Sequence, residues 1–240
     1  MQAIQVLVIS LERSTERRDR VQHELKNTFL HWEFLDAVDG FALKELPKSY
    51  DQAKVRRLQG YELTPGEIGC YLSHMKAWDH CVEQNRLTLV FEDDFVINGD
   101  LKKVLESLAQ MDQKWSLVRL AALYETEQRL IDRREGIELV ENKGDPVGAA
   151  AYLIKPSAAM RLIKYSSAIY EPVDHYLEHY SKHGVRMLAV KPYPVSIVGK
   201  DSTITDRPGR LPVKGFQKTK RSIYRWLDRL FSSSPWFPKR

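Results

Sequence analysis

Short apolar runs rich in β-branched residues recur along the chain, and each is separated from the next by enough residues to form a helix. These runs lie at residues 4–11, 31–35, 87–91, 116–123, 148–154 and 186–190. Runs of this length, bounded by polar turns, are typical of buried strands. Residues 125–143 are charged, with two short apolar pieces that suit a hairpin. The pattern therefore predicts a central sheet.

Segments with helical spacing of apolar residues alternate with these strands. The clearest starts at Thr64-Pro65-Gly66-Glu67, a capping box with Pro at the first helical position, and extends to about residue 85. Small side chains recur along it at spacings of three or four, which lets the helix approach another element closely. These are Gly66, Cys70, Ser73, Ala77 and Cys81. Further helices are expected at residues 12–26, 100–111, 156–165 and 171–184.

The alternation of strands and helices indicates one α/β domain, with a mostly parallel central sheet flanked by helices. We assign residues 1–213 to this domain, within which residues 43–61 form a loop or a short helix. Both cysteines fall in one predicted helix, roughly 16 Å apart, too far for a disulfide. We expect them to be reduced.

Charge is unevenly distributed. The chain has 240 residues and a net charge of +5. Residues 214–240 hold eight Lys or Arg against one Asp, or +7, so residues 1–213 carry −2. The basic pI of the chain comes from the tail, so a nucleic-acid partner is not expected for the domain.

The tail reads as a basic amphipathic helix at residues 218–232, with Trp226 among its apolar positions. Such a segment suits an anionic membrane surface, although it can also dock on its own domain or on a partner subunit. The sequence has no signal-peptide pattern at Met1 and no apolar run long enough to span a membrane. We therefore expect a cytoplasmic protein, peripheral on the inner face of the cytoplasmic membrane.

Three adjacent acids, Glu92, Asp93 and Asp94, follow directly after the apolar run at residues 87–91. A solvated acidic turn explains such a triplet in general, but ligands bind outside the carboxyl ends of strands in α/β sheets. Oxygen ligands suit Mg²⁺ or Mn²⁺. Because strand side chains alternate, Glu92 and Asp94 should share one face, while Asp93 faces away or anchors the loop.

Other polar residues have two readings each. Arg13 and Arg17 follow the first strand and suit either phosphate contact or a salt-bridged helix surface. Asp39 precedes a glycine, which suits a turn or contact with ribose hydroxyls. Ser73 and His74 are adjacent on the long helix, where a lone histidine is more often structural than catalytic.

A second set of candidates lies near the end of the domain. Asp174 falls in the first turn of a predicted helix, where it either favours the helix dipole or acts as a general base. His175, His179 and His183 are one turn apart, but a metal site is disfavoured because the histidines should lie on the polar side. Asp201 adds an acid in a polar loop.

Several of these stretches together resemble glycosyltransferase family 25, the lipooligosaccharide and procollagen galactosyltransferase family. The most specific is residues 63–74, Leu-Thr-Pro-Gly-Glu-Ile-Gly-Cys-Tyr-Leu-Ser-His, with Glu-Asp-Asp about 20 residues later. The others are residues 8–11 with Arg13 and Arg17, residues 37–40, 90–94, 151–154, 172–174 and 201–204. The family's usual Asn is Ser10 here, and its usual apolar residue before the Glu is Phe91.

The resemblance implies a GT-A-like fold that uses a UDP-sugar and Mn²⁺ or Mg²⁺. Asp94 would coordinate the metal, Glu92 would take a ribose or metal-side role, and Asp174 would be the base, with Asp201 as second choice and additional metal ligand. The remaining residues assigned to the donor site are Ser10, Leu11, Arg13, Arg17, Asp39, Ser73, His74 and Asp93.

The implied reaction is the inverting transfer of a hexose, with galactose favoured, from a UDP-sugar to a lipid-linked lipooligosaccharide or lipopolysaccharide acceptor. The alternatives are a UDP-glucose or UDP-N-acetylhexosamine transferase of the same fold, or a non-catalytic adaptor that only binds a nucleotide sugar. A two-metal phosphohydrolase is disfavoured, because one acidic cluster supplies too few ligands.

Overall fold

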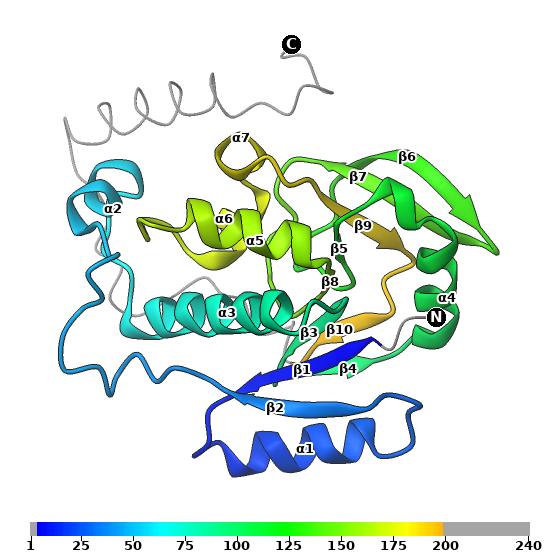
Figure 1. The fold of residues 1–240 in the computed structure, drawn as a ribbon, viewed down its shortest axis with the longest axis horizontal. Coiled ribbons are helices and arrows are strands. Elements are labelled where there is room, and N and C mark those ends of the chain that lie inside the picture. The colour runs from blue at the N-terminus through cyan, green and yellow to red at the C-terminus, as the bar shows by residue number, and fades with distance from the viewer. Residues whose placement is uncertain (1–3, 199–240) are drawn as a thin grey trace.

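The structure is a computed structural model that describes residues 4–198. A sheet of eight strands forms its centre, in the order β2-β1-β3-β8-β5-β9-β7-β6 (Figure 1). These strands are β1 (Gln5–Ser10), β2 (Trp32–Asp36), β3 (Thr88–Glu92), β5 (Leu117–Arg119), β6 (Glu127–Arg134), β7 (Ile137–Lys143), β8 (Ala151–Ile154) and β9 (Met187–Lys191). Two short strands, β4 (Phe95–Ile97) and β10 (Val195–Ile197), pair with each other and were not predicted.

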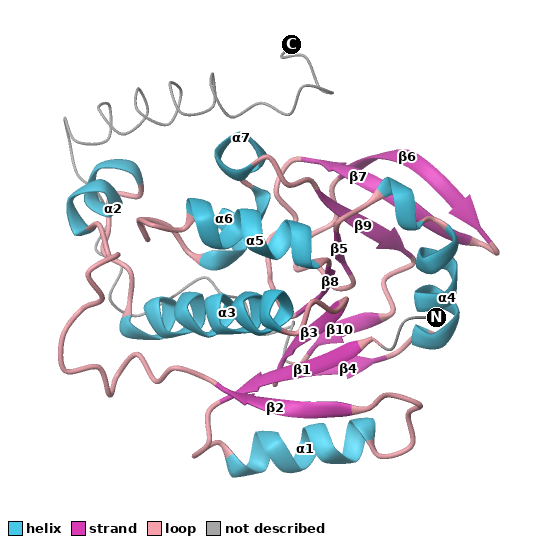
Figure 2. Ribbon diagram, viewed as in Figure 1, coloured by secondary structure: helices cyan, strands magenta, loops and turns pink. Residues whose placement is uncertain are grey.

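Helices cover both faces of the sheet (Figure 2). They are α1 (Thr15–Leu25), α2 (Gln52–Leu58), α3 (Pro65–Glu83), α4 (Leu101–Gln110), α5 (Pro156–Tyr165), α6 (Val173–Glu178) and α7 (Tyr180–His183), with a 3₁₀ turn at Asp112–Lys114. Alternate residues of β1 enter two separate cores. Leu7 and Ile9 pack with α3 and α5, whereas Val6 and Val8 pack with α1 and α4. The predicted α/β architecture is therefore confirmed as three layers.

The sheet is mixed, and the prediction of a mostly parallel sheet was wrong. Strand β1 runs parallel to β2 and β3, and β5 runs parallel to β9. Strand β8 is antiparallel to both β3 and β5, and β7 is antiparallel to β6 and β9. The physical reason lies in the connections. Parallel neighbours need a long crossover, usually a helix, and no α-helix occurs between β5 and β8.

Helix α3 begins as predicted. The Thr64 side chain accepts a hydrogen bond from the Glu67 backbone N–H, and the Glu67 carboxylate accepts one from the Thr64 N–H. The loop at residues 37–40 packs against the first turns of α3. A Cβ on Gly69 would lie 2.5 Å from the Val38 carbonyl oxygen, and one on Gly40 would lie 1.7 Å from the Pro65 carbonyl oxygen. Backbone therefore contacts backbone at this junction.

The predicted helix at residues 171–184 is broken at His179, whose ψ of 61° ends α6, and Gly184 ends α7 with φ of 68°. The break turns α7, so His183 is buried and its ring nitrogen bonds the Tyr176 carbonyl oxygen. The expectation that the histidines lie on the polar side was wrong for His183. His179 bonds Glu171, and the three histidines do not form a metal site.

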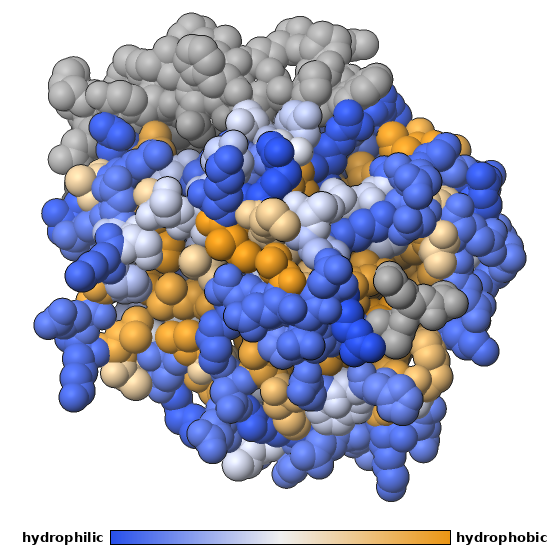
Figure 3. All heavy atoms as spheres, viewed as in Figure 1, coloured by the Kyte–Doolittle hydropathy of each residue, from blue (hydrophilic) through white to orange (hydrophobic). Residues whose placement is uncertain are grey.

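Both cysteines are free thiols, as predicted. Within residues 4–198 no helix is long and apolar enough to cross a bilayer. Polar residues cover most of the face shown in Figure 3. The tail at residues 214–240 and Asp201 lie outside the described residues.

Candidate active site

The cleft of interest opens where β1 and β3 end. The two strands are parallel neighbours, with Ile9 opposite Glu92, so the residues that follow them meet at one edge of the sheet. A cavity of about 390 Å³ lies against the loop after β1, and one of about 410 Å³ lies against α6. Both are lined by Gly66, Cys70, Glu92 and Asp94. We call the two parts the β1 side and the α6 side of one cleft.

Asp93 anchors the acidic loop. Ser10 donates a hydrogen bond of 2.7 Å to one carboxylate oxygen, and Arg17 pairs with the other at 2.9 Å. Arg20 donates to the Asp93 carbonyl oxygen at 2.6 Å. The Asp93 side chain is buried and held by β1 and α1. Asp93 thus makes the anchoring contacts that were one of the two expectations for it, and it also lines the β1 side of the cleft.

Asp94 has a different environment. Its Oδ1 atom is buried, and no donor among residues 4–198 reaches it. Burial and the charges of Glu92 and Asp93 raise the pKa of Asp94 to about 6. A buried carboxylate oxygen without a donor, facing a cleft beside a second acid, fits a hard divalent cation such as Mg²⁺ or Mn²⁺. Asp94 and Glu92, which line both sides of the cleft, are the residues that would hold it.

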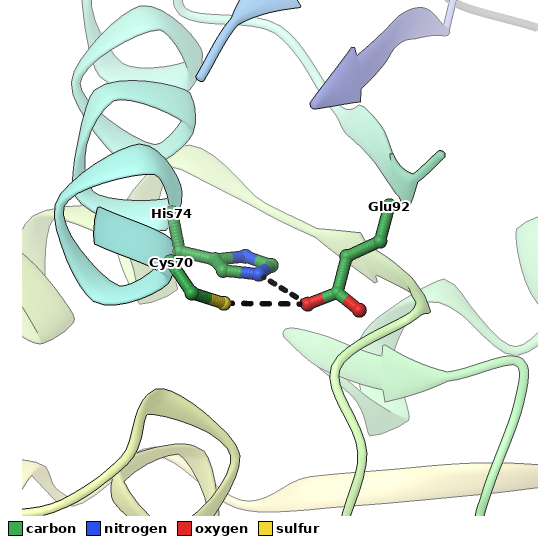
Figure 4. A group of neighbouring side chains, drawn as sticks. All are labelled: Cys70, His74 and Glu92. Atoms are coloured by element: carbon green, nitrogen blue, oxygen red, sulfur yellow. Dashed lines mark hydrogen bonds and ion pairs between the residues drawn. The ribbon is translucent and has the colours of Figure 1, made fainter. Parts of the chain in front are cut away.

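Glu92 is contacted from α3. His74 Nε2 lies 3.0 Å and Cys70 Sγ 3.5 Å from the same Glu92 oxygen, Oε1 (Figure 4). Burial opposes ionisation of Glu92, but the hydrogen bonds from His74 and Cys70 outweigh it and lower its pKa. His74 is fully buried and also contacts Tyr152. The structural reading of His74 therefore holds, and its contact links it to the cleft.

Several donor-site residues predicted on the β1 side line the cavity and also make contacts that hold the loop at residues 37–40. Arg13 pairs with Asp39, which also accepts a hydrogen bond from the Phe41 N–H at 3.1 Å, so Asp39 forms the turn. Ser73 accepts from the Val38 N–H at 2.8 Å and donates to the Gly69 carbonyl oxygen. The predicted residues that line this cavity are Ser10, Leu11, Arg13, Arg17, Asp39, Ser73, Glu92, Asp93 and Asp94.

Asp174 lines the α6 side, together with Glu92 and Asp94. Its carboxylate accepts from the His175 N–H at 3.0 Å and from the Gly148 N–H at 3.4 Å. The position in the first turn of α6 thus leaves the carboxylate in the cleft, with backbone donors around it. The structure brings Asp174 to the acidic loop although 80 residues separate them in the sequence.

Sequence reasoning missed two residues. Cys70 was read as packing, but it precedes His74 by one helical turn, and that spacing places both on one face toward Glu92. Phe41 lines the β1 side and is 73% exposed, the largest exposure among the large apolar residues of the described chain. An apolar residue in a polar loop gave no signal by itself.

The profile described as "Glycosyltransferase family 25 (LPS biosynthesis protein)" matches residues 3–177. Human procollagen galactosyltransferase 2 is 25% identical over 237 residues, covering 84% of this chain and 37% of that protein. A glycosyltransferase 25 family member of Anopheles gambiae is 28% identical over 239 residues, covering 87% and 40%. This chain spans less than half the length of these relatives.

Two further proteins are similar to this chain. The human protein named inactive glycosyltransferase 25 family member 3 is 35% identical over 128 residues, 48% of this chain and 21% of that protein. The crystal structure of the galactosyltransferase LgtC with donor and acceptor sugar analogs covers 97% of this chain and 98% of its own, at 13% identity and a TM-score of 0.42. The match over residues 3–177 identifies this chain as a member of glycosyltransferase family 25.

Proposed function

We propose that the chain is a metal-dependent, inverting hexosyltransferase that moves galactose from UDP-galactose to a lipid-linked lipooligosaccharide or lipopolysaccharide acceptor. The observation that carries the proposal is the cleft in which Asp94, with a buried oxygen that has no donor, and Asp174 line the same cavity. The names of the procollagen galactosyltransferases support the choice of sugar, and the family's description supports the acceptor class.

The nucleotide occupies the β1 side. This cavity of about 390 Å³ has two arginines, Arg13 and Arg17, at its wall, and an exposed aromatic ring at its rim. Phe41 lies near Gly66, where an added Cβ would be 3.7 Å from the ring, so one face of the cavity offers an apolar surface for the nucleobase. Stacking on an aromatic ring tolerates any base, so we assign to it affinity rather than base selectivity.

The diphosphate lies at the acidic loop. A divalent cation, when bound by Asp94 and Glu92, supplies Lewis-acid stabilisation of the charge on the leaving diphosphate. Asp93 keeps the loop in place through Ser10 and Arg17, and it does not itself need to contact the donor. Asp201 stays a proposal as an additional metal ligand or alternative base, outside the described residues.

The acceptor enters on the α6 side. Inversion requires the acceptor hydroxyl to attack the anomeric carbon from the side opposite the leaving UDP, with its proton passing to a carboxylate. Asp174 fits this role because its carboxylate lines the cleft and is oriented by the His175 and Gly148 N–H groups. The C–O bond to the diphosphate breaks as the new glycosidic bond forms.

A non-catalytic adaptor is the second candidate, and the human relative named inactive gives it a specific basis. An assay of UDP release with and without Mn²⁺ separates the two. UDP-galactose, UDP-glucose and both UDP-N-acetylhexosamines are supplied with a lipooligosaccharide acceptor, and the anomeric configuration of the product is read by NMR. An enzyme turns over one donor with inversion. An adaptor binds UDP-sugar without release of UDP.

We also propose that residues 214–240 attach the protein to an anionic membrane surface, close to a lipid-linked acceptor. The basis is the +7 charge of this segment and its apolar residues at helical spacing. Removal of residues 214–240 should abolish sedimentation with anionic vesicles and leave transfer to a soluble acceptor intact. Equal sedimentation of the two proteins would refute the attachment.

A further inference from the structure

A line of hydrogen bonds connects the hydrophobic core with Glu92. Trp78 Nε1 lies 2.9 Å from the Tyr152 hydroxyl, and that hydroxyl lies 2.8 Å from His74 Nδ1. His74 Nε2 lies 3.0 Å from Glu92 Oε1. Trp78, Tyr152 and His74 are each 0% exposed. The line therefore starts in a dry core and ends at a carboxylate in the cleft.

The direction of the protons in this line follows from its first member and from the need of the buried Tyr152 proton for an acceptor. An indole N–H can only donate, so the Tyr152 hydroxyl accepts from Trp78. The hydroxyl has one proton left, and its other partner is His74 Nδ1. Burial raises the pKa of Tyr152 well above its ordinary value, so that proton stays on the hydroxyl. His74 then accepts at Nδ1 and carries its own proton on Nε2, which it donates to Glu92.

Cys70 provides a second donor to the same oxygen. Its thiol lies 3.5 Å from Glu92 Oε1, and Figure 4 shows Cys70 and His74 reaching that atom from one face of α3. A thiol donates through its S–H, and at this position the Glu92 oxygen is the acceptor within reach. Two donors thus occupy Oε1, and Oε2 is the oxygen that remains for a ligand.

We propose that Cys70 and His74, supported by Tyr152 and Trp78, are positioning residues. They bond Oε1 of Glu92, so that Glu92 contacts the sugar nucleotide and its cation through Oε2 alone. The identity of the ligand that Glu92 contacts, a nucleotide sugar with its divalent cation, rests on the proposed function. The network itself is a property of the metal-free protein. The Cys70, His74 and Glu92 cluster could also be read as a zinc site. In the proposed network, Cys70 and His74 instead both donate to one oxygen of Glu92.

The first test reads the proton positions without any ligand. Nitrogen-15 NMR of the imidazole side chains, with His74 assigned from its loss in His74→Gln, should show a neutral ring protonated at Nε2 at pH 7.5. Tyr152→Phe should move the His74 Nδ1 resonance and leave the other histidines unchanged. A ring protonated at Nδ1, or at both nitrogens, would overturn the proton order and with it the proposal.

The second test uses matched pairs of variants and UDP with Mn²⁺ as the probe, measured by calorimetry. Cys70→Ala should weaken binding about three-fold or more, and Cys70→Ser, which keeps a donor, should restore most of it. His74→Gln keeps an N–H near the position of Nε2 and should bind better than His74→Leu. Cys81→Ala, on the same helix, is the control, because its thiol contacts the Arg86 and Ile154 carbonyl oxygens instead.

The outcomes separate this proposal from the proposed function. One outcome is that the variants show the expected order of affinities for UDP and Mn²⁺ while no UDP-sugar is turned over. In that case the positioning role stands and the proposed transfer reaction fails. If Cys70→Ala and Cys70→Ser bind as tightly as the natural chain, the positioning role fails even when transfer is observed. A sulfur-to-metal charge-transfer band on titration with Co²⁺, lost in Cys70→Ser, would mean that the cluster is a metal cage and would also overturn it.

Discussion

Ser10, the last residue of β1, donates a hydrogen bond of 2.7 Å to Asp93, the first residue after β3. This bond ties together two parallel strands at the point where both end. It also engages the carboxylate of the middle acid, which lines only the β1 side of the cleft, whereas Glu92 and Asp94 line both sides. The three acids of the triplet therefore differ in their environments, and we propose ligand binding for Glu92 and Asp94 only.

Exchange of single acids to amides should separate these roles. Asp93→Asn should lower the free energy of unfolding by about 1–3 kcal/mol, because it weakens the bonds to Ser10 and Arg17. Asp94→Asn and Asp94→Ala should stay folded and lose metal-dependent UDP release. Chemical denaturation and the release assay measure the two effects. Turnover by Asp94→Ala in Mn²⁺ would remove Asp94 from the metal role.

The raised pKa of Asp94, about 6, predicts a pH-dependent stability. In the unfolded state Asp94 has its ordinary pKa of 3.8, so it loses its proton at a lower pH than in the folded state. Without metal, the contribution of Asp94 to stability should therefore fall as pH rises from 3.8 to about 6 and stay low above it.

Asp94→Asn removes this pH dependence. In EDTA at pH 7.5 the variant should be more stable than the natural chain by about 2 kcal/mol, and at pH 4 the difference should be small. Added Mn²⁺ should stabilise the natural chain and leave Asp94→Asn unchanged. Thermal melts at both pH values, with and without Mn²⁺, measure this. An equal gain from Mn²⁺ in both proteins would contradict the assignment.

Arg119 is expected to support the α6 side of the cleft. Its buried guanidinium pairs with Glu178 of α6 and donates to the Val147 carbonyl oxygen, next to Gly148. Burial raises the pKa of Glu178 to about 7 although Arg119 opposes the shift. Arg119→Met should destabilise the protein by about 3–5 kcal/mol, because it leaves Glu178 buried without its cation.

The loss from Arg119→Met should be greater at pH 8 than at pH 6, because Glu178 escapes its charge by protonation at the lower pH. Urea denaturation at the two pH values tests this. Lys143→Ala is the control, since Lys143 pairs with the exposed Glu127 at the surface and such pairs contribute about 0–1 kcal/mol. A loss of similar size in both variants would contradict the prediction.

Phe41 should contribute to nucleotide affinity. Phe41→Ala removes the apolar surface at the rim of the β1 side and should raise the KM for the donor about ten-fold, with little change in kcat. Steady-state kinetics with varied UDP-sugar measures the two constants. Phe29→Ala, at an exposed phenylalanine outside both cavities, should leave the KM unchanged. A fall in kcat alone would place Phe41 elsewhere in the reaction.

Two glycines of α3 give a matched pair. Gly69→Ala would place a methyl group 2.5 Å from the Val38 carbonyl oxygen, and should cost about 1–3 kcal/mol of stability. Gly66→Ala meets nothing closer than 3.7 Å and should be neutral or slightly stabilising, because alanine favours helix. Melting temperatures of the two variants test the pair. The reverse order would mean that the loop at residues 37–40 moves freely from α3.

The sequence predicted the parts of the site that depend on local chemistry. The capping box located the start of α3. Glu92 and Asp94 line both sides of the cleft as expected, although β3 ends at Glu92 and Asp94 therefore lies in the turn before β4, where strand alternation does not apply. Strand direction was not predictable. The antiparallel direction of β8 is set by its pairing with β3 and β5, and the local sequence pattern of β8 does not indicate these partners. The break at His179 was missed because the periodicity continues across it.

Contacts within the cleft were harder to predict than its acids. Tyr152 reaches His74 from a strand 78 positions away, and its hydroxyl partner depends on packing between β8 and α3. The contacts of Cys70 and Asp39 depend on their neighbours in space: Cys70 contacts Glu92, and Asp39 pairs with Arg13 and accepts from the Phe41 N–H.

The backbone contact between the loop at residues 37–40 and α3 has a consequence for directed evolution of this protein. Main chain meets main chain at Gly40 and Gly69, so libraries that replace these two glycines would disturb the fold. The α6 side is lined by the side chains of Leu123, Val173 and Ile197. Under the proposed function, randomisation of these three positions is expected to change the choice of acceptor while the donor is kept.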